Sequence, residues 1–320
     1  MARWIAKALA QRAIGFMPDP DYWSDLVQRR IAGSVDLSYP FFLSRLDVAR
    51  KHLDSMGPER RPADVLELGT GWFPIVPIAF RLAGASHVST CDIVERVSKE
   101  RLQSTLQAFR RAAGDGELIR RFPLLDHNLA HRIQNLDGAH QPCAEQLRSL
   151  GVDYRVGGSP GAHLPPQSID LITSHAVLEY VCKEPFIELL NAFRRVLKSD
   201  GAMSHWIDLS DEYAYFDKNI SRLNFLRYSD RVWNLINNPI IPLSRLRIDD
   251  IRRLFAQAGF AIHEEATEKL DKDELDRLPL AKAFASRDME DMRVLDAWIL
   301  ARPSQADTSC VEAAASAKPG

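Results

Sequence analysis

The fold is decided by the stretch Asp64-Val65-Leu66-Glu67-Leu68-Gly69-Thr70-Gly71-Trp72-Phe73-Pro74. Its first five residues form a mostly apolar run, which is typical of a strand buried in a parallel sheet. The run breaks at two glycines and resumes as an apolar segment over 74–82, which predicts a helix with a proline in its first turn. A strand, a glycine turn and a helix start predict a loop that a cofactor can approach closely.

A dinucleotide site is the first alternative for this loop. Its fingerprint requires a third glycine for close packing of helix on strand, and that position carries Pro74. Glu67 stands just before the first glycine, where it has no part in binding a nucleotide phosphate. The loop therefore departs from the dinucleotide pattern.

A second predicted strand, residues 86–93, carries an acid near its end. Asp92 lies about twenty residues beyond the glycines, where a doubly wound fold places the carboxylate that binds ribose hydroxyls. Later apolar runs predict strands at 152–156, around 170–173, from 260 onward and at 294–300, with segments of helical spacing between them. This alternation predicts an α/β fold built on a largely parallel sheet.

Two later stretches narrow the family. Within residues 163–181, Leu-Pro is followed after two residues by Ser-Ile-Asp-Leu-Ile-Thr-Ser-His-Ala-Val-Leu-Glu-Tyr-Val, and residues 193–207 read Phe-Arg-Arg-Val-Leu-Lys-Ser-Asp-Gly-Ala-Met-Ser-His-Trp-Ile. With the acid-x-Gly-x-Gly loop, these stretches resemble class I S-adenosylmethionine (SAM) methyltransferases of the methyltransferase type 11 branch. The resemblance covers about residues 62–210. It implies a Rossmann-like, seven-stranded doubly wound sheet, with SAM as the cofactor.

The resemblance also implies where SAM binds. SAM has a sulfonium, an amino-acid end and a ribose but no phosphate, so an acid beside the loop suits it. The acid that often precedes Leu-Pro and meets the adenine has no clear counterpart here, which leaves backbone groups with His163 nearby. Trp72 and Phe73 either face the sulfonium through cation–π attraction or pack the first helix. The residues expected to bind the cofactor are Glu67, Gly69, Thr70, Gly71, Asp92, Ile93, His163 and Ser174.

Methyl transfer needs an in-line nucleophile, a dry pocket and sometimes a base. His175 and His205 are the candidate bases, because both are expected near the carboxyl ends of strands and histidine titrates near neutrality. His175 could instead serve only through its backbone, and His205 could be a satisfied histidine lining the sheet. Tyr180 replaces a histidine common in the family and is a third candidate, through its hydroxyl or ring. A strand end and a solvated loop explain His205, Asp208 and Asp211 better than a metal site, so no metal is predicted.

The chain is expected to consist of a core with additions. An N-terminal helical cap either covers part of the cofactor cleft or only adds stability. Residues 193–207 are expected to contain the fifth strand, and the segment after it is acidic and aromatic and well placed to shape the substrate pocket. The predicted parts are the cap at 1–60, the SAM-binding core at 61–210 with a polar insertion at about 114–150, the pocket insertion at 211–247, the last helix and strands at 248–302 and a disordered tail at 303–320.

The composition excludes several classes of protein. Hydrophobic residues make up 46% of the chain and charged residues 26%, which is ordinary for a globular protein. A net charge of −2 gives no electrostatic basis for binding nucleic acid, and no segment approaches the length of a membrane span. The four cysteines lack metal or disulfide spacing, which fits a reducing compartment. We expect a cytoplasmic enzyme with a small-molecule substrate, no nucleic-acid partner and no membrane span.

Three functions are compatible with these observations. The leading hypothesis is methyl transfer from SAM to oxygen or nitrogen of a small-molecule or glycan-like acceptor. In the second, another carbon of the sulfonium is attacked, for example by SAM's own amine, which gives a cyclised product and methylthioadenosine. The third is a SAM-binding module without catalysis.

Overall fold

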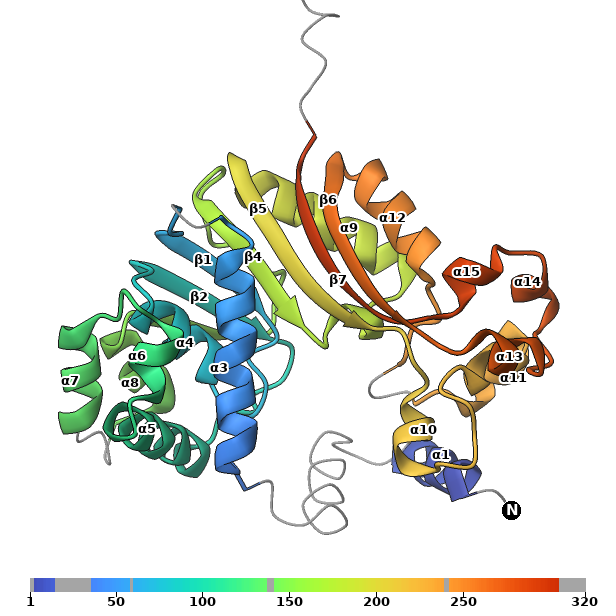
Figure 1. Ribbon diagram of the computed structural model, residues 1–320, viewed down its shortest axis with the longest axis horizontal. Coiled ribbons are helices and arrows are strands. Elements are labelled where there is room, and N and C mark those ends of the chain that lie inside the picture. The colour runs from blue at the N-terminus through green and yellow to red at the C-terminus, as the bar shows by residue number, and fades with distance from the viewer. Residues whose placement is uncertain (1–2, 15–35, 58–59, 137–140, 239–241, 305–320) are drawn as a thin grey trace, which may run out of the picture.

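The computed structural model describes residues 3–14, 36–57, 60–136, 141–238 and 242–304 (Figure 1). Its centre is a seven-stranded sheet in the order β3-β2-β1-β4-β5-β7-β6. Strands β1 to β5 pair in parallel, and β7 runs antiparallel between β5 and β6. The predicted Rossmann-like, doubly wound sheet is confirmed. The strands are β1 (Asp64–Leu68), β2 (His87–Asp92), β3 (Val152–Val156), β4 (Ile169–His175), β5 (Leu197–Asp208), β6 (Phe260–Lys269) and β7 (Val294–Pro303).

Helices cover both faces of the sheet because both faces are apolar. On one face Phe42, Phe80 and Phe109 belong to a single buried cluster, and on the other face Phe186 and Phe255 do. The first face carries α3 (Tyr39–Asp54), α4 (Ile75–Leu82) and α5 (Lys99–Gly114), and the second carries α9 (Lys183–Val196) and α12 (Ile248–Gln257). The strand order reverses between β1 and β4, and in open α/β sheets ligands bind outside the carboxyl ends of the strands at such a point.

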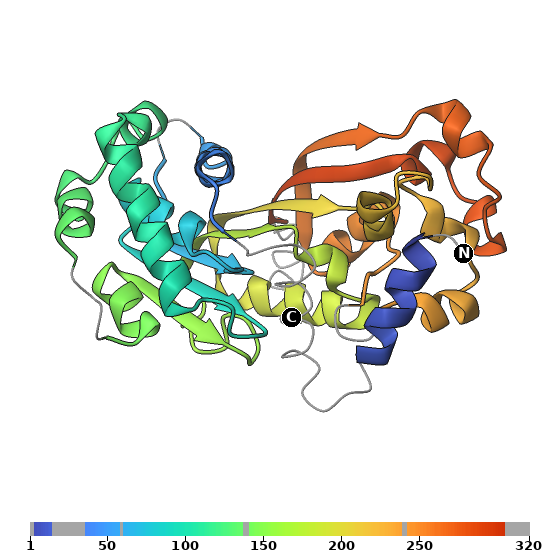
Figure 2. The ribbon, with the colours of Figure 1, turned by 90° about the horizontal axis from the view of Figure 1, so that it is seen from below.

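A second group of helices packs beside the sheet and has its own buried cluster (Figures 1 and 2). It joins the N-terminus to the segment after β5, since the Trp4 ring lies 5.6 Å from that of Tyr213 and the Trp4 amide donates to Asp217. The buried Arg247 ties this group to the sheet by donating to backbone carbonyls of Leu209 and Met292. Its elements are α1 (Arg3–Ile14), α10 (Glu212–Phe216), the 3₁₀ helix η2 (Asn224–Arg227), α11 (Asp230–Ile236), α13 (Lys272–Asp276), α14 (Lys282–Ala285) and α15 (Met289–Met292).

Several elements differ from the boundaries expected from sequence. The predicted polar insertion is helical, and its apolar residues Leu118, Leu129 and Ile133 join the core of the first face. After β4 the chain forms the short 3₁₀ helix η1 (Leu178–Tyr180) before α9 begins. Strand β6 extends far beyond its apolar start. Its later residues are polar and many are exposed, which an edge strand tolerates because one of its sides faces solvent. The helices of the insertion are α6 (Glu117–Arg121), α7 (His127–Asn135) and α8 (Cys143–Ser149).

Two expectations fall partly on residues that are not described. Residues 15–35 of the predicted cap lie outside the described residues, as do residues 305–320 of the predicted tail. Pro303, where the tail was expected to begin, is the last residue of β7. The amide of Ser304 donates to the carbonyl of Gly259, so the chain is still hydrogen-bonded at this point.

Candidate active site

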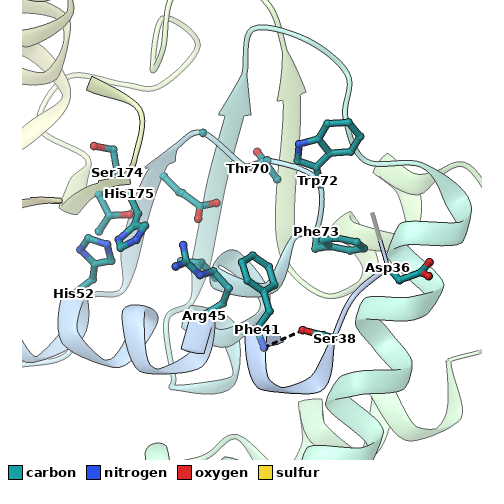
Figure 3. A pocket seen from close by; sticks show the side chains of 15 residues that line it. Asp36, Ser38, Phe41, Arg45, His52, Thr70, Trp72, Phe73, Ser174 and His175 are labelled. Carbon is teal, nitrogen blue, oxygen red and sulfur yellow. Dashed lines mark hydrogen bonds between the residues drawn. The ribbon is translucent and has the colours of Figure 1, made fainter. Parts of the chain in front are cut away.

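A cavity of about 420 Å³ opens at the carboxyl ends of β1 and β4, with α3 forming its opposite wall (Figure 3). This is the position at which the strand order reverses. Four segments of the chain contribute to it: the residues before and within α3, the end of β1 with the glycine loop, the start of α4 and the end of β4. The lining residues are Asp36, Ser38, Phe41, Arg45, His52, Glu67, Gly69, Thr70, Gly71, Trp72, Phe73, Val76, Thr173, Ser174 and His175.

The two glycines of the loop are required for different reasons. Both have left-handed backbone angles, with φ of +87° at Gly69 and +67° at Gly71. A Cβ at Gly69 would overlap with the side chain of Val177, whereas a Cβ at Gly71 would have no atom within 4 Å. Gly69 is therefore closed in by protein, and Gly71 presents bare backbone to open space. A ligand can approach the loop on the Gly71 side.

Glu67 is buried at the cavity and belongs to a hydrogen-bonded chain with Thr90 and Thr70. Its side chain is 5% exposed, and it accepts a hydrogen bond of 2.5 Å from Thr90, whose hydroxyl lies 2.6 Å from that of Thr70. Burial raises the pKa of Glu67 to about 8, the bond from Thr90 opposes this rise, and the charge of Asp92 adds to it. The carboxyl group is therefore mostly neutral at pH 7, and a cation placed beside it would favour its ionisation.

Asp92, the last residue of β2, holds the glycine loop through a backbone amide. Its two carboxylate oxygens accept hydrogen bonds from the amides of Gly71, at 2.9 Å, and Ile93, at 2.8 Å. Ile93 is 74% exposed. His163 lies 3.2 Å from the hydroxyl of Ser89. Asp92, Ile93 and His163 do not line the cavity itself, so the candidate cofactor residues form two groups joined by the glycine loop.

His175 lies in the cavity wall at the end of β4. Its ring stacks on Trp206 at 4.6 Å, and its Nδ1 is buried without a hydrogen-bond partner in the described part of the chain. Burial, together with the charges of Arg45 and Lys51, lowers the pKa of His175 to about 3. The imidazole is therefore neutral at physiological pH. The next residue, Ala176, has a φ of +57°, a strained angle that fixes the turn leaving the strand.

The structure places the other two catalytic candidates away from the cavity. His205 is fully buried on the opposite face of the sheet, where its ring stacks on Phe193 and its Nδ1 lies 2.7 Å from the hydroxyl of Ser174. Tyr180 donates its hydroxyl to Glu212 and packs on the helices beside the sheet. Neither residue lines the cavity, because alternate strand residues face opposite sides and η1 directs Tyr180 toward α10.

Trp72 and Phe73 both line the cavity, but their contacts are with protein. The ring of Trp72 lies under the guanidinium of Arg101, with 3.8 Å from Cζ to the ring centroid. Phe73 packs against the buried cluster of the first face. Phe73 thus has the packing role of the second alternative, while the ring of Trp72 is in a cation–π contact with a side chain of α5.

Sequence reasoning missed the contribution of α3. Arg45 and His52 are seven residues apart, so two helical turns place them on one side of α3, and both face the cavity (Figure 3). The Nδ1 of His52 lies 2.9 Å from the hydroxyl of Ser204, and its ring lies 4.8 Å from that of Trp298. The seven-residue spacing was the available signal. It was hidden because the same segment carries the apolar stripe that packs on the sheet.

An aromatic wall continues from the cavity along the sheet. We define it as His52, His175, Trp206 and Trp298, whose rings lie within 4.6 to 6.2 Å of a neighbour in the set. Trp206 and Trp298 are register partners on β5 and β7, and neither is fully buried. The Nζ of Lys51 lies 3.9 Å above the Trp298 ring. Lys51 and His52 are both on α3, and beyond α3 no described helix is drawn over β5 and β7 on this face of the sheet (Figure 1).

The chain is similar to known proteins both in part of its sequence and in its fold. Residues 111–204 match the model of the Methyltransf_11 family, a methyltransferase domain. No curated protein sequence matches the chain. A SAM-dependent methyltransferase from Mesorhizobium loti is 17% identical, with a TM-score of 0.41, and the alignment covers 80% of this chain and 99% of that one.

Two further solved structures are similar at the same level. A SAM-dependent methyltransferase from Methanosarcina mazei is 12% identical with a TM-score of 0.44, covering 77% of this chain and 95% of that one. A ribosomal protein L11 methylase from Lactobacillus delbrueckii subsp. bulgaricus is 12% identical with a TM-score of 0.37, covering 82% and 78%.

The chain contains a class I SAM-dependent methyltransferase domain, so it is a SAM-dependent transferase with SAM as its cofactor. The residues present fit this group. An open glycine face, a buried acid that pairs with no base among the described residues and a second acid at the loop suit a ligand that has positive charge and a ribose. Within the described ranges, no three potential metal ligands come together, and no helix is both long and apolar enough to cross a membrane.

Proposed function

We propose that the cavity and the adjoining glycine loop bind SAM, and that the enzyme methylates oxygen or nitrogen of a small-molecule or glycan-like acceptor. The observation that carries this proposal is the order of groups along the loop. A buried acid lies at one end, bare glycine backbone in the middle and Asp92 at the other end. When bound, SAM supplies a methyl group that its sulfonium has already activated.

Each group along the loop would bind a different part of SAM. Asp92 would accept hydrogen bonds from the ribose, and the exposed Ile93 would pack on the adenine. Glu67 would face the positive part of the ligand, where ionisation of its carboxyl gives an attraction in a buried setting. Thr70 would support this acid through Thr90. Together these residues position the methyl group, and positioning is a large part of what the reaction needs.

The acceptor would lie against the aromatic wall. Tryptophan rings bind flat apolar faces, including those of aromatic rings and sugars, while their indole N–H groups can still hydrogen-bond. His175 would accept a hydrogen bond from the acceptor's hydroxyl or amine, because its ring is neutral at physiological pH. Its low pKa makes it a weak general base, so its role would be orientation of the nucleophile. We also propose that the enzyme acts in the cytoplasm on a small molecule.

Product analysis tests the reaction. The purified protein is incubated with SAM and a panel of hydroxyl- and amine-bearing acceptors, and the nucleoside product is identified by mass. S-adenosylhomocysteine formed only with an acceptor supports methyl transfer. Methylthioadenosine would instead indicate attack on another carbon of SAM. Binding of SAM with no turnover across the panel would favour a module without catalysis.

Calorimetry tests the cofactor site separately. Asp92→Ala should weaken SAM binding at least tenfold, because it removes both a charged hydrogen-bond acceptor for ribose and the support of the loop. Asp200→Ala is the matched control, because Asp200 pairs with Arg60 near the amino end of β5, far from the glycine loop. Undiminished binding by Asp92→Ala would show that the ribose assignment is wrong.

A further inference from the structure

Among the described residues, the guanidinium of Arg45 in the cavity has no anionic partner. It lies on α3 and lines the cavity, where its Cζ lies 5.2 Å from the ring centroid of Phe41 (Figure 3). Its Nε is buried and has no hydrogen-bond partner, and within the described ranges no carboxylate lies within ion-pair distance of the group. Burial lowers the pKa of Arg45, which reflects the cost of holding this charge away from water.

Another arginine on the same helix shows what an ordinary environment looks like. Arg50 donates to Asp54 at 2.6 Å and to the backbone carbonyl of Arg121 at 2.6 Å. A partly buried arginine normally finds partners of this kind, because leaving the charge unpaired is costly.

Glu67 lines the same cavity, but its carboxyl is mostly neutral at pH 7 and forms no ion pair with Arg45. Asp36 also lines the cavity, but none of the ion pairs of the described residues joins it to Arg45. The Arg45 guanidinium is therefore available to an anionic group of a ligand.

We propose that Arg45 is the receptor for a carboxylate that enters this cavity with a ligand. The proposal rests on the proposed function, since it takes the cavity to be the place where SAM and the acceptor meet. A guanidinium presents a planar fork of donors that binds a carboxylate through two parallel hydrogen bonds. The carboxylate comes either from the amino-acid end of SAM or from the acceptor.

The two sources make different use of the surroundings. An amino acid carries an ammonium and a carboxylate on one carbon, and the cavity offers an acid, Glu67, and a base, Arg45, that do not pair with each other. This arrangement is complementary to the amino-acid end of SAM. An anionic acceptor would reach Arg45 from the aromatic wall, where Lys51 adds a second positive charge above Trp298. Both sources satisfy the same guanidinium.

Calorimetry with SAM and decarboxylated SAM separates the first source. Arg45→Met keeps the aliphatic packing of the side chain and removes its charge, and Arg45→Lys keeps the charge without the planar fork. If SAM's carboxylate binds here, Arg45→Met should weaken SAM about 10- to 100-fold, while decarboxylated SAM should change less than about threefold. Arg45→Lys should fall between the wild type and Arg45→Met. Arg50→Met is the matched control and should bind both ligands as the wild type does.

Titration of the protein saturated with S-adenosylhomocysteine tests the second source. Benzoate and benzamide are the probes, because they differ only in the charge of one group on the same ring. Benzoate bound by the wild type and lost in Arg45→Met, with benzamide unaffected, assigns the carboxylate to the acceptor. Thermal unfolding of each variant checks that the fold is kept.

Two results would overturn the assignment. The first is an Arg45→Met protein that binds SAM, decarboxylated SAM and benzoate as the wild type does. The second is an equal loss for SAM and decarboxylated SAM with no preference for benzoate over benzamide, since this would mean that Arg45 acts only through packing. In either case a wild type that binds SAM leaves the proposed function intact. A wild type that does not bind SAM would refute the proposed function and the assignment with it.

Discussion

Replacing Glu67 by glutamine should uncouple SAM binding from the release of a proton. Burial raises the pKa of Glu67 to about 8 in the free protein. About nine-tenths of the molecules therefore carry the neutral acid at pH 7. The sulfonium and ammonium of SAM favour the ionised acid, so binding should expel its proton. We expect the wild type to release close to one proton per SAM at pH 7, and its affinity to rise about tenfold per pH unit up to about pH 8.

The glutamine side chain has nearly the same shape and can still accept the hydrogen bond from Thr90, but it cannot ionise. The affinity of Glu67→Gln should therefore lose this dependence on pH. Above pH 8, where the wild-type acid is ionised before binding, the wild type should bind SAM about 10- to 100-fold more tightly than the variant, as expected for a charge-assisted contact. Near pH 6 the two proteins should differ much less.

The same substitution predicts a change in the stability of the ligand-free protein. The folded pKa is raised from 4.5 to about 8, so the contribution of Glu67 is fully present below pH 4.5 and is lost as the pH rises toward 8. At roughly 1.4 kcal/mol per pH unit, this interval corresponds to about 5 kcal/mol as an upper bound. Glu67→Gln does not suffer this loss. Its melting temperature relative to the wild type should therefore increase steadily from pH 5 to pH 8.

Isothermal titration calorimetry at pH 7 measures the proton directly. Phosphate and Tris have different ionisation enthalpies, so the binding heat of the wild type should differ between the two buffers and that of Glu67→Gln should differ much less. The amine of SAM also titrates near pH 7.7 to 8.0, and the difference between the two proteins removes its contribution. Glu264→Gln, a change at an exposed acid on β6, is the control. A wild-type heat that does not depend on the buffer would refute a neutral, buried Glu67.

Three further predictions concern the loop, the histidines and the buried arginine. Gly69→Ala should destabilise the fold strongly, because its Cβ overlaps with the side chain of Val177. Gly71→Ala should cost only about 1–2 kcal/mol of stability in backbone strain but should weaken SAM binding, because its Cβ stands on the open face of the loop. Calorimetry and thermal unfolding compare the two variants, and equal destabilisation would contradict the geometry. His175→Gln should lower kcat/KM for an acceptor found by product analysis, because His175 lines the cavity. His205→Phe should change the melting temperature and leave kcat within about threefold, because His205 is bonded to Ser174 in the core. A large loss of turnover at an unchanged KM in His205→Phe would instead support a catalytic role for His205. Arg247→Met should lower the free energy of unfolding, measured by chemical denaturation, by about 3–5 kcal/mol, because it leaves buried carbonyls without donors. A loss below about 1 kcal/mol would show that water replaces the missing donors.

Much of the site follows from local sequence because parallel strands align their carboxyl ends. The glycine loop, the acid before it and Asp92 each follow a buried strand or end one, so a doubly wound sheet brings them to one edge. Their expected functions are still to be tested by binding. Residues outside this rule were harder to place. Tyr180 follows the strand-four motif in sequence, but a 3₁₀ turn takes it to Glu212, and no periodicity predicted that turn.

By itself, the sequence determined the order of strands and helices, the cofactor loop and the sheet edge at which chemistry is expected. These are local properties of apolar runs, glycines and the residues that end each strand. Only the tertiary structure decided that His175 faces the cavity and His205 the core, because strand alternation separates two faces without saying which one is covered. Only the tertiary structure shows that α3 packs across that face and forms the cavity wall that carries Arg45. Burial in the same structure raises the pKa of Glu67, so that its carboxyl is mostly neutral at pH 7. The burial of a side chain and the pairing of its charge depend on neighbours that are far apart in the chain, so a local sequence pattern does not reveal them.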